Sequence, residues 1–199
     1  MKKGLYENMK KLLVIILAAA LFCGCTNARP EPDPPGTDEN ITIGGKEYSI
    51  DLTSLSIEWL KLTAEDMEQL ALMTNLTRLE VKMCEITDIS PLAELTKLER
   101  LDLRFNEISD LSPLAELVNL THLNLSHNEI RDVSALVKLA NLRELELGAN
   151  YISDLSPLYG KLTKLVNLYI YDNNPDTIDD YLFGSSIRAG FPEGCTIHF

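Results

Sequence analysis

Histidine side chains are the residues of this chain best suited to general acid–base catalysis. The three histidines are His122, His127 and His198, and only the first two lie close together in the sequence. The chain has no Gly-x-Ser-x-Gly, no phosphate-binding loop, no His-Glu-x-x-His and no Cys-x-x-Cys pair. We therefore interpret the histidines as solvated side chains and predict that the chain is not an enzyme. A hydrolase hidden in the unusual C-terminal region is the less favoured alternative.

Aspartates that recur at a fixed spacing are the most obvious candidates for metal binding. They are Asp88, Asp110, Asp132 and Asp154, and each lies two residues before a serine. Carboxylates are good calcium ligands, so the row suggests a calcium site. An aspartate beside a turn more often accepts a hydrogen bond from the backbone. We favour that structural role and predict no metal site and no cofactor.

Two of the four cysteines, Cys84 and Cys195, lie in the part of the chain that we expect to fold. We predict that they are free thiols, because several strand spacings of about 4.8 Å separate them, whereas a disulfide needs Cα atoms within about 7 Å. Cys84 is interpreted as a small buried thiol and not as a reactive one.

The other two cysteines lie in a segment that is typical of protein targeting. Lys10 and Lys11 are followed by an apolar run over residues 12–22 and then by Gly24 and Cys25. The run is too short for a comfortable membrane span. The segment resembles a bacterial lipoprotein signal, which implies removal of residues 1–24 and acylation of Cys25. We expect a protein outside the cytoplasm, held at the cell surface by that lipid alone. Because Phe22 and Cys23 depart from the motif, ordinary secretion is the alternative.

The elements that would position any functional residue come from a repeat that organises half of the chain. Its pattern is an apolar residue, two free positions, Leu, one free position, an apolar residue and then Asn or Cys. The frames are Leu76-Leu79-Val81-Cys84, Leu98-Leu101-Leu103-Asn106, Leu120-Leu123-Leu125-Asn128, Leu142-Leu145-Leu147-Asn150 and Leu165-Leu168-Ile170-Asn173. Successive frames start 22 residues apart, except for a last step of 23.

This pattern is the leucine-rich repeat signature. The chain resembles the bacterial internalin-type subclass, because its return segments read Thr-Asp-Ile-Ser-Pro-Leu-Ala at 87–93 and Ser-Asp-Leu-Ser-Pro-Leu-Ala at 109–115. The resemblance implies an α/β leucine-rich repeat solenoid, with short parallel strands on a concave face and 3₁₀ or short helical turns on the convex face. It also implies adhesion or contact with a host surface as one use.

Local physics explains the same shape. Paired apolar residues such as Leu101 and Leu103 alternate with polar ones, as a strand with one buried face requires. The asparagines follow each strand, where their amides can satisfy the backbone of a stacked turn. Ser-Pro pairs such as Ser90-Pro91 predict a serine N-cap followed by proline at the first helical position.

Both flanks of the array differ from the repeat, as the caps of a solenoid should. Thr63 and Asp66 can form a capping box, followed by Met67 and Met73, which we predict to be buried. Near the end we expect a helix over 179–189 and a closing strand over 195–199. The expected organisation is a signal peptide at 1–24, a Pro-rich acidic tether at 25–45, a degenerate first repeat with the N-terminal cap at 46–75, leucine-rich repeats at 76–174 and a C-terminal cap at 175–199.

The charge of the chain excludes one class of partner. The formal net charge is -12, and removal of residues 1–24 takes away four Lys and one Glu, so it becomes -12 - 4 + 1 = -15. Binding to nucleic acid is therefore not expected, since it depends on a basic surface. We expect a soluble, weakly self-repelling monomer.

Function is predicted to lie on the solvent face of the strands, where one residue from each repeat forms a column. The central column reads Ser56, Glu80, Asp102, Asn124, Glu146 and Tyr169. Arginine and aromatic residues are common anchors of protein recognition. The candidate protein-binding residues are Trp59, Arg78, Glu80, Lys82, Arg100, Asp102, Arg104, Phe105, His122, Asn124, Glu144, Glu146, Tyr169 and Tyr171.

The expected function is thus non-catalytic recognition of a protein or peptide. Two other interpretations are open. The charged residues could simply pair with one another and keep the sheet soluble. Alternatively, Tyr169 and Tyr171 could form a stacking platform for a glycan or for the cell wall.

Overall fold

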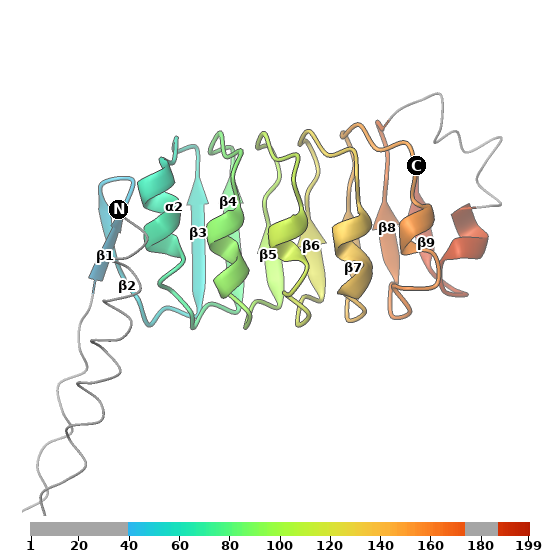
Figure 1. The fold of residues 1–199 in the computed structure, drawn as a ribbon, viewed down its shortest axis with the longest axis horizontal. Helices are drawn as coiled ribbons and strands as arrows, with labels where there is room; N and C mark the ends of the chain where they lie inside the picture. The colour runs from blue at the N-terminus through green and yellow to red at the C-terminus, as the bar shows by residue number, and fades with distance from the viewer. Residues whose placement is uncertain (1–39, 174–186) are drawn as a thin grey trace, which may run out of the picture. The chain divides into compact units, whose positions relative to one another are not determined.

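The computed structural model describes residues 40–173 and 187–199 (Figure 1). The expected signal segment, Cys25 and most of the expected tether lie outside these residues. Most of the helix expected over 179–189 also lies outside them, and residues 187–190 at its end are helical.

A parallel sheet of seven strands is the main element of the fold, and its strand order follows the chain. Its strands are β3 (Ser54–Glu58), β4 (Arg78–Lys82), β5 (Arg100–Asp102), β6 (His122–Asn124), β7 (Glu144–Glu146), β8 (Asn167–Tyr169) and β9 (Thr196–His198). The register aligns equivalent positions of the repeats, so that Leu79, Leu101 and Leu123 lie side by side. The predicted leucine-rich repeat solenoid is therefore confirmed.

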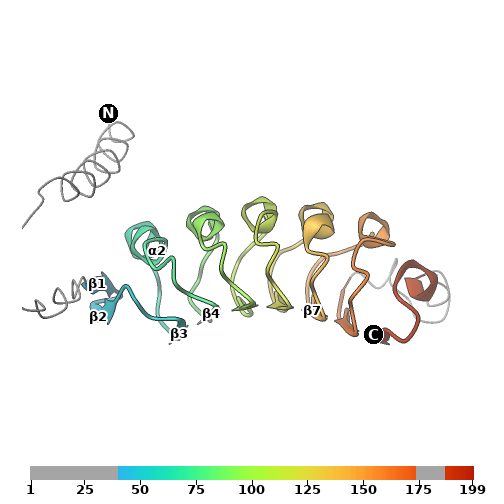
Figure 2. The ribbon, with the colours of Figure 1, turned by 90° about the horizontal axis from the view of Figure 1, so that it is seen from below.

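Short 3₁₀ turns lie on the side of the solenoid opposite the strands (Figure 2). They are η1 (Ser90–Glu94), η2 (Ser112–Leu114), η3 (Ser134–Lys138) and η4 (Ser156–Leu158). The predicted serine N-cap is wrong, because the serine is the first residue of each turn and its side chain caps nothing. The aspartate two residues earlier takes that role, since Asp110 Oδ1 accepts a hydrogen bond from Ser112 N at 2.8 Å. This backbone role was the one favoured for the aspartate row.

The core is a continuous column of leucine and isoleucine between the strands and the turns. One repeat contributes Leu98, Leu101, Leu103, Ile108, Leu111, Leu114 and Leu117, each at most 2% exposed. No repeat could bury these side chains without its neighbours, so stacking of the repeats creates the core.

Buried asparagines connect each repeat to the one before it. The Asn106 amide nitrogen donates to Val81 O at 2.8 Å and Leu103 O at 2.9 Å, and Asn106 Oδ1 accepts from Cys84 N at 3.0 Å. Equivalent bonds occur in the next repeats, as predicted for this row. Cys84 occupies the same slot, is fully buried, and its thiol donates to Lys82 O at 3.1 Å.

The N-terminal cap starts earlier than the boundary expected at residue 46. Strands β1 (Asn40–Ile43) and β2 (Lys46–Ser49) form an antiparallel hairpin, whose Ile41 and Ile43 are buried. Helix α2 (Ala64–Leu70) follows β3 and begins with the predicted capping box of Thr63 and Asp66. Asp66 also accepts a hydrogen bond from Gly44 N at 2.7 Å, which ties the hairpin to the helix. Met67 and Met73 are buried, as predicted.

The C-terminal end is closed by the predicted strand, since β9 extends the parallel sheet beside β8. Ile187, Phe191 and Ile197 bury their side chains against the last repeat, and the ring of Tyr159 meets Phe191 edge-on at 5.7 Å between centroids. Cys84 and Cys195 are free thiols, as predicted, although Cys195 is only half-buried.

In the part of the chain that the structure describes, no helix has the length and apolar character needed to cross a bilayer.

Candidate functional site

A hollow of about 250 Å³ lies on the solvent side of the sheet, which we call the concave face. Its floor is the sheet itself at Leu79, Leu101 and Leu123, whose side chains are buried in the core on the other face. Its polar lining consists of Arg78, Glu80, Arg100, Asp102, Arg104, His122, Asn124, Glu144 and Glu146. Strands β4 to β7 thus bring most of the predicted site residues together. Trp59, Lys82, Phe105, Tyr169 and Tyr171 do not line the hollow.

The register of the sheet determines which side chains of the hollow are neighbours. Arg100, His122 and Glu144 face one another across β5, β6 and β7. Asp102, Asn124 and Glu146 form the adjacent column. The predicted central column is therefore a real column of the sheet, and a second column lies beside it.

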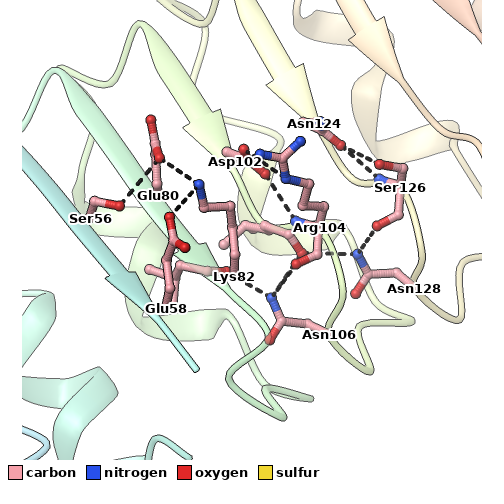
Figure 3. Close-up of polar contacts among 12 residues, drawn as sticks. Ser56, Glu58, Glu80, Lys82, Asp102, Arg104, Asn106, Asn124, Ser126 and Asn128 are labelled. Carbon is pink, nitrogen blue, oxygen red and sulfur yellow. Dashed lines mark hydrogen bonds and ion pairs between the residues drawn. The ribbon is translucent and has the colours of Figure 1, made fainter. Parts of the chain in front are cut away.

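Glu80 is the centre of an ion-pair network at the N-terminal end of the hollow. Lys82 Nζ donates to Glu80 Oε2 at 2.8 Å, and Arg78 Nε donates to Glu80 Oε1 at 3.0 Å. Lys82 also pairs with Glu58 at 2.6 Å, as Figure 3 shows. The hydrogen bond from Lys82, followed by that from Arg78, lowers the pKa of Glu80 to about 2. At this end the charges pair with one another, as the alternative interpretation expected.

Asp102 and Arg104 form a looser pair on β5 and just beyond it. Arg104 Nε lies 3.4 Å from Asp102 Oδ2, and the Arg104 backbone N–H donates to Asp102 Oδ1 at 3.2 Å (Figure 3). Burial raises the pKa of Asp102 by more than these contacts lower it. The Asp102 carboxylate would therefore be stabilised by a further positive charge.

The C-terminal end of the hollow is acidic. Burial raises the pKa of Glu146, and the nearby carboxylates of Glu144 and Asp102 raise it further. The neighbouring Asn124 carbonyl oxygen is already used, because it accepts from Ser126 Oγ at 2.6 Å and from Ser126 N at 3.0 Å. The charge of Arg104 and a hydrogen bond with Asn124 oppose these shifts, but within the described residues neither Glu144 nor Glu146 forms an ion pair with lysine or arginine.

His122 separates the basic end from the acidic end. Its Nδ1 lies 2.9 Å from Thr121 Oγ1, and its Nε2 lies 3.9 Å from Glu144 Oε2, which is too long for a hydrogen bond. Burial, followed by the charge of Arg100, lowers the pKa of His122, so the ring is neutral at pH 7. Within residues 40–173 and 187–199, Arg100 itself forms no ion pair and no side-chain hydrogen bond, and it is exposed.

Trp59 and Phe105 lie at the edge of the sheet, where the chain leaves each strand. Both have a positive φ, 60° and 58°, and this left-handed conformation recurs at the equivalent residues Met83, His127, Ala149 and Asp172. The sequence does not predict this row, since large residues rarely adopt the conformation. Phe105 stacks on His127 with 4.1 Å between ring centroids, whereas Trp59 is 75% exposed.

The two tyrosines predicted on the concave face each have one covered ring face. Tyr169 stacks on His198 of β9 with 4.2 Å between centroids. Tyr171 lies across Gly148, where a Cβ atom would meet its ring at 2.4 Å. They do not form one shared platform with both ring faces open to a glycan. His198 was not predicted in this column, because the segment before β9 interrupts the repeat spacing.

The chemistry available at this site is charge recognition. Among the residues that the structure describes, no three His, Cys, Asp or Glu side chains are grouped so that they could hold a metal ion. The lining offers guanidinium, carboxylate, amide and neutral imidazole groups. Such a set suits a ligand that carries charged and hydrogen-bonding groups.

The comparisons with known proteins agree with the architecture. Residues 74–116 and 118–160 each match the family model for leucine-rich repeats in two copies. No curated protein matches the chain. An internalin, inlF, from Listeria monocytogenes is 34% identical with a TM-score of 0.61, over 75% of this chain and 43% of that protein. Internalin C2 from the same organism is 32% identical with a TM-score of 0.56, over 65% of this chain and 54% of that protein.

A leucine-rich repeat protein from Leptospira interrogans has the same fold, with a TM-score of 0.63 at 23% identity. That similarity covers 75% of this chain and 38% of the Leptospira protein. The chain thus spans about half the length, or less, of the structures that it matches. The repeats and the similarity to Listeria internalins are firm findings.

Proposed function

We propose that this leucine-rich repeat protein is a non-catalytic recognition module, which binds a protein or peptide partner through its concave face. The hollow over β4 to β7 carries the proposal, because it gathers charged and polar side chains from four neighbouring strands. Among the described residues, Arg100 at one end forms no ion pair with a carboxylate, and Glu144 and Glu146 at the other form none with lysine or arginine. Charged groups without an ion pair are available to a ligand.

The size of the face favours a protein over a small molecule. Seven strands spaced by about 4.8 Å span roughly 30 Å, which matches one side of an ordinary protein interface. Arg100 and the aromatic edge residues Trp59 and Phe105 are of the types that anchor such interfaces. Adhesion, including contact with a host surface, is one use that similarity to internalins supports.

The proposed place of action is the outside of a bacterial cell. The basic residues, apolar run and Gly24-Cys25 pair support cleavage before Cys25 and its acylation. Residues 26–39, with four prolines, would then act as a spacer between the membrane and the repeats. Secretion without a lipid anchor is the competing possibility.

The anchor is testable with one substitution. Cys25→Ser in the full chain should abolish lipid attachment and shift the protein from the detergent phase to the aqueous phase of a detergent partition, because a serine cannot form the thioether. Mass spectrometry of the mature N-terminus checks the cleavage site. Ala28→Ser, in the same segment, is the control and should stay in the detergent phase. Equal partitioning of all three proteins would refute the anchor.

The binding proposal is tested by affinity capture with the full chain, purified in mild detergent. The bait is compared with a variant carrying Arg100→Ala, His122→Ala and Glu144→Ala, and with a control carrying Glu107→Ala, Glu129→Ala and Lys161→Ala away from the hollow. We expect one protein to be captured by the parent and the control from host-surface or bacterial-envelope extracts, and lost by the concave variant. Equal capture by all three folded baits would place binding elsewhere.

A further inference from the structure

We infer that the partner presents an acidic and a basic side chain about 10 Å apart, the acidic one to Arg100 and the basic one to Glu144 and Glu146. This inference rests on the proposed function and specifies the kind of segment that the hollow would take. It follows from which charges the protein leaves unpaired, how far apart they lie and what separates them.

The first step is to separate paired charges from available ones. Glu80 already holds Arg78 and Lys82, and Lys82 is nearly buried between Glu80 and Glu58. Arg104 is engaged with Asp102. Arg100, which is exposed, is thus the cation of the hollow that has no anionic partner within residues 40–173 and 187–199.

The acidic end is available for a related reason. Glu144 and Glu146 are half-buried on β7, and within the described residues neither forms an ion pair with lysine or arginine. The Glu144 carboxylate lies 3.9 Å from the His122 ring, which is neutral at pH 7. A cation supplied by a ligand would gain more here than on an open surface, because partial burial weakens screening by water.

The distance between the two ends selects the ligand. Arg100 and Glu144 belong to the same column of the sheet, with His122 between them, so two strand spacings of about 4.8 Å separate their backbones by roughly 10 Å. A free amino acid holds its amine and carboxylate on one carbon and cannot span that gap. An extended peptide rises about 3.3 Å per residue, so side chains two to four residues apart can reach both ends.

The middle of the hollow fits the backbone of such a peptide. His122 and Asn124 present neutral polar groups there, while the side chains of Leu101 and Leu123 point to the core on the other side of the sheet. The His122 Nε2 has no hydrogen-bond partner among the described residues and can exchange a hydrogen bond with a peptide group. A segment with opposite charges at its ends and an uncharged residue between them is complementary to this arrangement.

The test is a selection of displayed random heptapeptides on the immobilised full chain, followed by sequencing of the enriched pool. The parent protein should enrich peptides that carry one acidic and one basic residue two to four positions apart. Arg100→Glu should abolish the enrichment of acidic residues and retain that of basic ones. Glu144→Lys combined with Glu146→Lys should do the reverse.

Matched controls reproduce these charge changes outside the hollow. Lys161→Glu corresponds to Arg100→Glu, and Glu107→Lys with Glu129→Lys corresponds to the double reversal; all three control residues are exposed. Both controls should enrich the parental pool, which excludes an effect of net charge alone. If a charge-reversed protein fails to fold, Arg100→Gln and Glu144→Gln replace it, and each should weaken a selected peptide about tenfold.

The outcomes separate this inference from the proposed function. A pool without the charge pair, whose binding is nevertheless lost by the alanine variant of the hollow, overturns the inference and leaves concave-face binding in place. An enriched pool that is insensitive to every concave-face substitution overturns both. The absence of any enriched peptide also counts against the inference. If the hollow recognises a charged segment, an isolated peptide with the same charges should be sufficient for binding.

Discussion

At the scale of single residues, Glu146 illustrates a conflict between stability and availability for a ligand. Its folded-state pKa is raised above the ordinary value, chiefly by burial. At pH 7 the carboxylate is charged in both the folded and the unfolded chain, so folding bears the cost of removing a charge from water. That cost disappears as the pH falls and the carboxylate binds a proton. A residue that only supported the fold would have no reason to bear it.

Glu146→Gln is therefore expected to stabilise the protein at pH 7, by about 0.5–2 kcal/mol. The gain should vanish in acid, where the carboxyl of the parent protein is itself neutral. Urea unfolding of both proteins at pH 7 and at a pH near 3 measures the difference. A loss of stability at pH 7 would mean that a partner within the protein already stabilises the carboxylate.

Glu80 has the opposite dependence on pH. Its pKa in the folded protein is about 2 against 4.5 for the free side chain, so its ion pairs contribute fully above pH 4.5 and are lost as the pH falls towards 2. Glu80→Gln should cost about 1–3 kcal/mol at pH 7 after allowance for screening, and little at pH 2. Denaturant titrations at several pH values check this slope. Glu129→Gln, at an exposed residue, should leave the parental pH profile unchanged.

The sequence predicts which residues share the concave face, because the 22-residue period and the alternation along each strand define it. It does not predict which charges pair. Whether Arg78 or Arg100 reaches Glu80 depends on side-chain geometry that no spacing encodes. The same applies to Tyr171, whose ring is covered because the residue at 148 in the preceding repeat is a glycine.

At the scale of elements, the asparagine row joins each strand and turn to those of the preceding repeat. The Asn128 amide nitrogen donates to Leu103 O and Leu125 O, both at 3.0 Å, and its Oδ1 accepts from Ile108 N at 3.0 Å. All these groups are buried. Loss of the amide leaves several backbone groups without a partner and without access to water.

Asn128→Ala should accordingly destabilise the fold by at least about 3 kcal/mol, at about 1–3 kcal/mol for each unsatisfied group. The comparison is Asn119→Ala, which removes a single exposed hydrogen bond to Thr96 O and should cost less than about 1 kcal/mol. Urea unfolding followed by circular dichroism measures both. Similar losses for the two variants would show that the buried row contributes no more than a surface contact.

Elements inside the array were predictable and those at its ends were less so. Strands, turns and the asparagine row repeat, so each copy supports the interpretation of the others. The β1–β2 hairpin has no such support, and it follows a Pro-rich stretch whose composition suggested that the tether continued to residue 45. The capping box of α2 was predicted, because Thr63 and Asp66 satisfy a local rule that needs no repeat.

At the scale of the whole molecule, each repeat contacts only its neighbours along the chain, and stability should depend on position. A cavity at the centre weakens two interfaces between repeats, whereas a cavity at an end weakens one. Leu123 in β6 and Ile197 in β9 occupy equivalent buried positions in the middle and at the C-terminal end of the sheet.

Leu123→Ala should cost about 3–5 kcal/mol, and Ile197→Ala should cost nearer 2 kcal/mol. Hydrogen exchange should show that Ile197→Ala loosens the last strands first, while Leu123→Ala affects amides on both sides of β6. Urea unfolding measures the totals. If the terminal substitution costs as much as the central one, the solenoid unfolds as one unit without position dependence.

The identical register of successive strands has a consequence for the history of the gene. Coding segments for adjacent repeats are similar in sequence, so unequal crossing-over can insert or delete one of them in frame. The encoded protein would keep its asparagine row and its core, because every junction between repeats uses the same contacts. Only the number and order of the residues lining the concave face would change, so a lineage could acquire a new binding specificity by recombination before any point mutation.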